Sequence, residues 1–228
     1  MKITNWILLA LGTIGFVIDV SAQYDYGLTP INTREAYEAS LIDNPNARLK
    51  DLAQEIEGIQ LDIKYSTSEN FTGKVIYREP RAFLRQEAAS ALAAVQKQLK
   101  KKGYGLKIFD AYRPYSVTII FYELYLDTAY VASPYTGSRH NRGAAVDLTL
   151  FDLKTGVELD MGTPFDEFTE QSSPLLQDLP EEIMKNRTLL RSVMEKNGFS
   201  IYPTEWWHFD FKGWEEYDIL DVPFDQLD

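Results

Sequence analysis

The chain has 228 residues, no cysteine and a formal net charge of −11 at pH 7. This length allows one domain with a proper hydrophobic core, and we expect no nucleic-acid partner because phosphate binding needs a basic surface. The lack of cysteine excludes disulfides, a lipidated cysteine, a thiol nucleophile and a thiolate zinc site, so any metal must be held by imidazole and carboxylate groups.

The first residues, 1–22, have the order of a secretory signal. Lys2 precedes an apolar run over residues 6–18, and small residues lead up to Ala22. A membrane anchor is the alternative, but a spanning helix needs about 20 apolar residues, and Asp19 ends a shorter run. We therefore expect cleavage after Ala22, a periplasmic or secreted protein, and no stable membrane insertion once the signal is removed.

Residues 23–57 begin polar and turn-rich, and we expect an N-terminal arm that lies on a single domain covering residues 58–228. Three helices are expected in that domain. Apolar residues recur at helical spacing over residues 86–102, which predicts the first helix. The second helix begins at Pro114, and its predicted apolar face consists of Val117, Ile120, Phe121 and Leu124. The third helix is bounded by Pro180 and by the pair Asn197-Gly198.

Apolar runs predict strands at residues 106–109, 144–150, 199–202 and 206–211. In the second of these, alternation places Val146 and Leu148 on one face and Asp147 on the other. Helices and strands are mixed, and tight turns outnumber crossover helices late in the chain. The fold class expected is α+β, a single domain with a central antiparallel sheet flanked by helices.

The whole chain contains two histidines, and each lies within a few residues of a carboxylate. Two imidazoles and one carboxylate with an open fourth position make a catalytic zinc site, whereas a structural site fills all four positions. His140, Asp147 and His208 are therefore predicted to hold one zinc ion, although cobalt, nickel or iron would also suit these ligands. The alternative is a pair of hydrogen-bonded structural histidines.

Glu205 and Arg113 are the candidate catalytic residues. Glu205 lies three residues before His208, which on a regular strand would put the two side chains on opposite faces, so we expect Glu205 in the preceding turn. From there it could act as general base on the metal-bound water. Arg113 precedes Pro114 and would offer a fixed cation to the carbonyl oxygen as negative charge develops, with a surface salt bridge as the alternative.

Several segments resemble, in order and spacing, the D-alanyl-D-alanine dipeptidases of the vancomycin-resistance type. The resemblance covers about residues 58–212 and is specific in combination. It is carried by Leu61-Asp-Ile-Lys-Tyr65, Asn70-Phe-Thr-Gly73, Asp110-Ala-Tyr-Arg-Pro114, Ser138-Arg-His140, Asp147-Leu-Thr-Leu150, Met161-Gly-Thr-Pro-Phe-Asp166 and Glu205-Trp-Trp-His208.

The resemblance implies zinc-dependent hydrolysis of D-Ala-D-Ala to two D-alanines. It implies the same three metal ligands and the same roles for Glu205 and Arg113. It also adds Ser138, Tyr65 and Asp166 as substrate-contacting residues. A carboxylate at Asp166 can pair with the ammonium of a free dipeptide, and the Ser138 hydroxyl can bind near the substrate carboxylate.

Two features depart from the family pattern. The loop at residues 130–137 is longer, and a secretory signal would place the enzyme outside the cytoplasm, which favours turnover or scavenging of wall-derived dipeptide over antibiotic resistance. One alternative is a zinc D,D-carboxypeptidase or peptidoglycan endopeptidase on the same scaffold. Another is a non-catalytic zinc-stabilised binding domain, as in hedgehog proteins, although such a module would not need Glu205 or Arg113.

Overall fold

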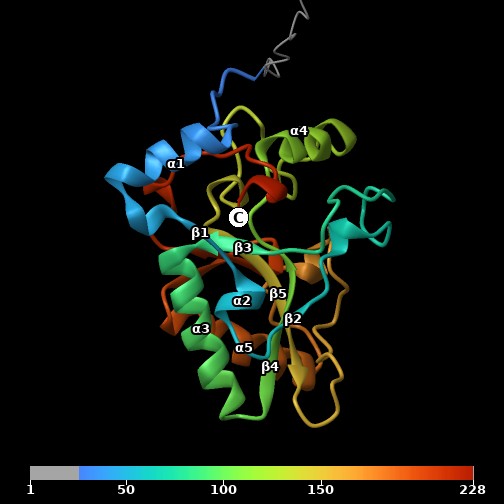
Figure 1. Ribbon diagram of the computed structural model, residues 1–228. Helices are drawn as coiled ribbons and strands as arrows, with labels where there is room; N and C mark the ends of the chain where they lie inside the picture. The colour runs from blue at the N-terminus through green and yellow to red at the C-terminus, as the bar shows by residue number, and fades with distance from the viewer. Residues whose placement is uncertain (1–25, 228) are drawn as a thin grey trace, which may run out of the picture.

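The computed structural model describes residues 26–227 (Figure 1). The predicted signal at residues 1–22 lies outside the described residues. Among residues 26–227, no helix combines the length and the apolar character that a bilayer-spanning segment requires.

A five-stranded sheet forms the centre of the fold, in the order β2-β4-β5-β7-β6. Neighbouring strands are antiparallel except β2 and β4, which run parallel over two residue pairs. The α+β class and the mainly antiparallel sheet are thus confirmed. The strands are β2 (Gln60–Leu61), β4 (Tyr104–Asp110), β5 (Ala145–Asp152), β6 (Phe199–Tyr202) and β7 (Glu205–Phe211).

Two long helices, α3 (Gln86–Lys100) and α5 (Glu181–Lys196), correspond to two of the predicted helices. The first packs on β4, the second packs on β6, and the two helices contact each other, so they cover one part of the sheet together. Their buried residues recur at helical spacing, as with Leu92, Val95 and Leu99 of α3, because burial of that stripe stabilises the helix more than propensity does.

The helix predicted at Pro114 exists as α4 (Tyr115–Leu124), but its buried face was predicted wrongly. Val117 and Phe121 are buried, whereas Ile120 and Leu124 are 41% and 49% exposed. The buried stripe instead includes Thr118, whose hydroxyl accepts a hydrogen bond from Asn141 at 2.8 Å. This hydrogen bond links the buried face of α4 to the 3-10 helix His140–Arg142.

The segment expected to be an arm contains α1 (Arg34–Asp43), β1 (Leu49–Asp51) and α2 (Leu52–Glu55). The short strand β1 pairs antiparallel with β3 (Phe83–Arg85). This segment also contributes side chains to the main hydrophobic core, namely Tyr37, Leu41, Leu49, Leu52 and Ile56. These buried side chains make the segment part of the folded domain.

Arg85, which is 1% exposed, joins this segment to two others. Its guanidinium donates to the carbonyl oxygens of Ala47, Arg142 and Asp218, and its backbone N–H donates to the carbonyl of Gly143. Gly143 has a φ of 67°, and a Cβ there would lie 2.4 Å from a methyl group of Leu49. Glycine therefore allows both the left-handed turn and the close packing of β1 on the loop that carries His140.

Candidate active site

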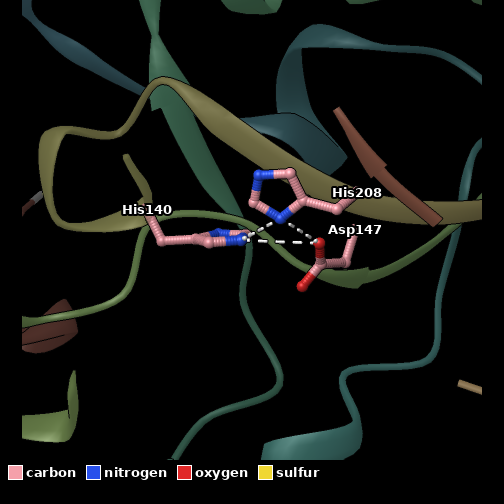
Figure 2. Close-up of side chains that lie close together, drawn as sticks. All are labelled: His140, Asp147 and His208. Atoms are coloured by element: carbon pink, nitrogen blue, oxygen red, sulfur yellow. Dashed lines mark hydrogen bonds and ion pairs between the residues drawn. The ribbon is translucent and has the colours of Figure 1, made fainter. Parts of the chain in front are cut away.

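His140, Asp147 and His208 converge at one point (Figure 2). His140 begins a short 3-10 helix, whereas Asp147 on β5 and His208 on β7 are direct register partners. Nδ1 of His208 lies 3.1 Å from Nε2 of His140 and 3.1 Å from Oδ1 of Asp147, and Nε2 of His140 lies 3.4 Å from that same oxygen. All three residues are buried.

The outer nitrogen of each imidazole faces a hydrogen-bond acceptor. Nδ1 of His140 lies 2.6 Å from the carbonyl oxygen of Ala111, and Nε2 of His208 lies 2.9 Å from Oδ1 of Asp210. With the ring protons on these outer nitrogens, the inner nitrogens can both present lone pairs to a metal ion. Oδ1 of Asp147, which shares this point, is buried without a hydrogen-bond donor.

Three acceptors so close together fit a metal ion. Ligand atoms about 2.0 Å from a tetrahedral zinc lie about 3.3 Å apart, which agrees with the separations of 3.1 to 3.4 Å. With neutral imidazoles, all three atoms can act as acceptors toward one ion. His140, Asp147 and His208 therefore fit a divalent metal, and their donor set suits zinc.

Glu205 is the first residue of β7 and pairs with Tyr202, so its predicted place in the preceding turn was wrong. The pairing of β6 and β7 shifts in register between Ile201 and Tyr202. This irregularity breaks the alternation of side chains: Glu205 and His208 both line the active-site pocket although they are three positions apart, an odd offset that would put them on opposite faces of a regular strand. Oε2 of Glu205 lies 3.9 Å from Nδ1 of His208.

Burial raises the pKa of Glu205 to about 8, and the carboxylates of Asp147 and Asp166 act in the same direction. The position of Glu205, beside His208 and in the same pocket as the three ligand-type side chains, suits a general base.

Arg113 lies between β4 and α4 and is also buried. Its Nε and one terminal nitrogen contact Oδ2 of Asp110 at 3.0 and 2.8 Å, and its guanidinium lies 4.8 Å from the centre of the Phe121 ring. The Tyr77 hydroxyl donates to the other oxygen of Asp110 at 3.0 Å. The guanidinium is thus held rigidly, 3.8 Å from Oδ2 of Asp147, in a buried network and not in a surface salt bridge.

Asp166 is held in an unusual backbone conformation. Among the described residues, it is the one non-glycine residue with positive φ, at 64°. The Tyr65 hydroxyl donates to both of its carboxylate oxygens, and burial followed by the charge of Asp147 raises its pKa to about 8. Such strain is typical of functional sites, and here it directs an acidic group into the pocket.

Ser138 lines the same pocket, and its Oγ accepts a hydrogen bond from the backbone N–H of His140 at 3.2 Å. Its hydroxyl proton therefore stays available for an anionic ligand. All eight residues singled out from the sequence line this one pocket, namely Tyr65, Arg113, Ser138, His140, Asp147, Asp166, Glu205 and His208.

The sequence reasoning missed other residues around this pocket. Aromatic rings from several segments line it, namely Phe71, Phe121, Tyr130, Phe168, Tyr202 and Trp207. Phe71 and Trp207 lie inside segments that carry the family resemblance, but no spacing in the sequence relates the six rings to one another. Asp210 could have been found, because it lies two residues after His208 and therefore on the same face of a regular strand.

Comparison with known proteins agrees with this geometry. The chain is 38% identical to a D-alanyl-D-alanine dipeptidase of Escherichia coli (strain K12) over 172 residues, which cover 75% of this chain and 89% of that protein. It is 34% identical to D-alanyl-D-alanine dipeptidases of Enterococcus faecium and Enterococcus faecalis, over 68% and 76% of this chain and 86% and 92% of those proteins. Residues 45–224 match the family model described as D-ala-D-ala dipeptidase, and the chain belongs to that family of metallopeptidases.

Proposed function

We propose that this protein hydrolyses free D-Ala-D-Ala to two D-alanines with the help of one zinc ion. The observation that carries the proposal is a single pocket in which three metal-type ligands, His140, Asp147 and His208, lie beside Glu205 and Arg113. Membership of the dipeptidase family supports the same substrate.

Each of these side chains has a separate role in the reaction. Zinc held by the three ligands would lower the pKa of a coordinated water and polarise the scissile carbonyl. Glu205 accepts a proton from the attacking water and passes it to the leaving amine. The Arg113 guanidinium stabilises the negative charge that develops on the carbonyl oxygen, because Asp110 fixes it beside the metal ligand Asp147.

Asp166 and Ser138 select the two ends of the substrate. Asp166 pairs with the ammonium group, and the Ser138 hydroxyl donates to the carboxylate. A longer peptidoglycan stem would place an amide beside Asp166 in place of the ammonium, and an amide cannot neutralise the charge of the carboxylate. The rings of Phe71 and Phe168 contact each other, with their centres 5.3 Å apart, and form part of the apolar wall. These features favour a free dipeptide over a stem peptide.

Product analysis tests this assignment. The purified protein, with its zinc content measured, is incubated with D-Ala-D-Ala, N-acetyl-D-Ala-D-Ala and a pentapeptide stem. We expect D-alanine release from the free dipeptide to be the most efficient. Preference for the stem would support a D,D-carboxypeptidase or endopeptidase instead, and no turnover of any of the three peptides by zinc-loaded protein would support a binding domain.

The proposed role is turnover or scavenging of wall-derived dipeptide outside the cytoplasm. The basic, apolar and small-residue order of residues 1–22 supports export. Expression of the full chain and of a chain lacking residues 1–22 tests it, with cell fractionation and mass spectrometry of the N-terminus. We expect the full chain to be processed after Ala22 and exported. A full chain that stays in the cytosol with its N-terminus intact would contradict this proposal without affecting the chemistry.

A further inference from the structure

The carboxylate of Asp210 contacts both His208 and Arg139, the residue next to His140. Its Oδ1 accepts from Nε2 of His208 at 2.9 Å, and its Oδ2 lies 3.6 Å from Nε of Arg139. Arg139 directly precedes His140 in the sequence. Asp210 is buried, and its register partners on the neighbouring strands are Ala145 and Ser200, small residues that leave room for this arrangement.

Arg139 is held by aromatic rings. Its guanidinium carbon lies 4.8 Å from the centre of the Trp214 ring and 5.5 Å from that of Tyr202, and the Tyr202 ring in turn contacts His208. The Nε atom of Arg139 is buried and has no hydrogen-bond partner in the described part of the chain, and Oδ2 of Asp210 lies 3.6 Å from it. The rings fix the position of a cation whose counter-ion is Asp210.

We infer that Asp210 is a positioning residue of the metal centre and that Arg139 acts on the metal through Asp210. The inference rests on the proposed metal centre. Asp210 holds the His208 ring with Nδ1 toward the metal and strengthens that nitrogen as a ligand, because a carboxylate that accepts the outer N–H makes an imidazole more basic. Arg139 keeps the carboxylate oriented, since it attracts the oxygen that does not contact His208.

Mutation distinguishes this arrangement from a purely structural ion pair. Loss of a structural pair would change the thermal stability of the protein but not the zinc affinity of the folded state. A positioning pair alters zinc affinity, because loss of such an outer carboxylate typically weakens binding about 10–100-fold. In addition, a residue that acts only through Asp210 has no effect once the Asp210 charge is gone, which a double-mutant cycle detects.

The experiment measures the zinc dissociation constant of the full-length protein by competition with a chromogenic chelator. The variants are Asp210→Asn, Asp210→Ala, Arg139→Gln and the double variant Arg139→Gln/Asp210→Asn. Glu158→Gln is the matched control, because Glu158 also pairs with a basic side chain, Lys107, at 3.2 Å but does not line the pocket. Thermal unfolding of each metal-free variant reports folding separately.

We expect Asp210→Asn and Asp210→Ala to weaken zinc binding about 10–100-fold. Arg139→Gln should weaken it by a smaller factor, and the double variant should equal Asp210→Asn alone. The absorption spectrum of the cobalt-loaded protein should shift in the Asp210 variants, and Glu158→Gln should behave as wild type. The near-isosteric Asp210→Asn keeps the test decisive if Asp210→Ala does not fold.

Three outcomes separate the possibilities. Zinc affinity of Asp210→Asn within about twofold of wild type would overturn the role of Asp210. If Arg139→Gln changed the zinc dissociation constant by the same factor in wild type and in Asp210→Asn, the coupling of Arg139 to the metal through Asp210 would be overturned. Failure of the wild-type protein to bind zinc stoichiometrically would instead refute the metal centre itself, and with it the proposed function.

Discussion

The Tyr65 hydroxyl donates to both carboxylate oxygens of Asp166, at 3.0 and 3.1 Å, although 101 positions in the sequence separate the two residues. Asp166 also has a positive φ of 64°. The hydrogen bonds and the backbone together fix the direction of the acidic group before a substrate arrives. Preorganisation of this kind favours a ligand whose ammonium lies at one defined place.

Asp166→Asn should raise the KM for D-Ala-D-Ala by about 10²-fold, because the charge-assisted contact with the ammonium is lost. Tyr65→Phe should act in the same direction by about tenfold, the typical effect of one hydrogen bond to a charged group. Steady-state kinetics with D-Ala-D-Ala and with N-acetyl-D-Ala-D-Ala measure both effects. An equal loss of activity on the blocked dipeptide, which has no ammonium, would show that Asp166 does not bind that group.

Stability should depend on pH through Asp166. Burial raises the pKa of this carboxyl group to about 8 in the folded protein, above its ordinary value of 3.8. The folded state therefore binds the proton more tightly than the unfolded state does. The resulting stabilisation is complete below about pH 4 and is lost as the pH rises through 8.

Thermal unfolding across this pH range measures the effect. Asp166→Asn carries a neutral group at every pH and should lose less stability than wild type between pH 4 and pH 8. Parallel stability curves for the two proteins would contradict the raised pKa. Glu158→Gln removes a partly exposed carboxylate and serves as the control for a simple change in charge.

Glu205→Gln should lower kcat by a factor of about 10² or more, since the amide cannot accept the proton of the attacking water. Glu205 is not among the three ligand residues, so zinc content should stay at the wild-type level. Metal analysis and steady-state kinetics on the same preparation give both quantities. Wild-type kcat in this variant would exclude the assigned role, and loss of zinc would make Glu205 a ligand.

Arg113→Lys should lower kcat about 10²–10³-fold with little change in KM, because the cation is needed where charge develops in the transition state. A lysine keeps the charge but cannot make the two contacts to Asp110 or stack as a planar group on Phe121. Asp110→Asn should give a smaller decrease in kcat, because it loosens the same guanidinium. A change confined to KM would mean that Arg113 binds the ground state instead.

The sequence predicted the cluster of His140, Asp147 and His208 because its composition left few choices. With two histidines and no cysteine, a zinc site with two imidazole ligands could use only His140 and His208, together with a nearby carboxylate. The helices α3 and α5 were predictable because their buried residues repeat locally and proline or glycine marks their ends. These features depend on neighbours in the sequence.

What the sequence did not predict depends on contacts between distant segments. The register shift between β6 and β7 brings Glu205 to the same side as His208, and it arises from pairing that no alternation pattern encodes. The buried face of α4 includes Thr118, which accepts a hydrogen bond from Asn141, a residue outside that helix. The contact between Arg139 and Asp210 likewise joins a loop to a strand across the fold.

The buried guanidinium of Arg85 joins the N-terminal segment to the turn that follows His140. A chain trimmed to residues 58–228 would lack the Ala47 carbonyl that accepts one of its N–H groups, and it would lack the Leu49 side chain that rests on Gly143. Both losses fall on the turn that presents His140, while the central strands keep their own pairing. Such a fragment would also lack the core side chains that this segment supplies, so residues far from His140 in the sequence belong to the folded unit that positions it.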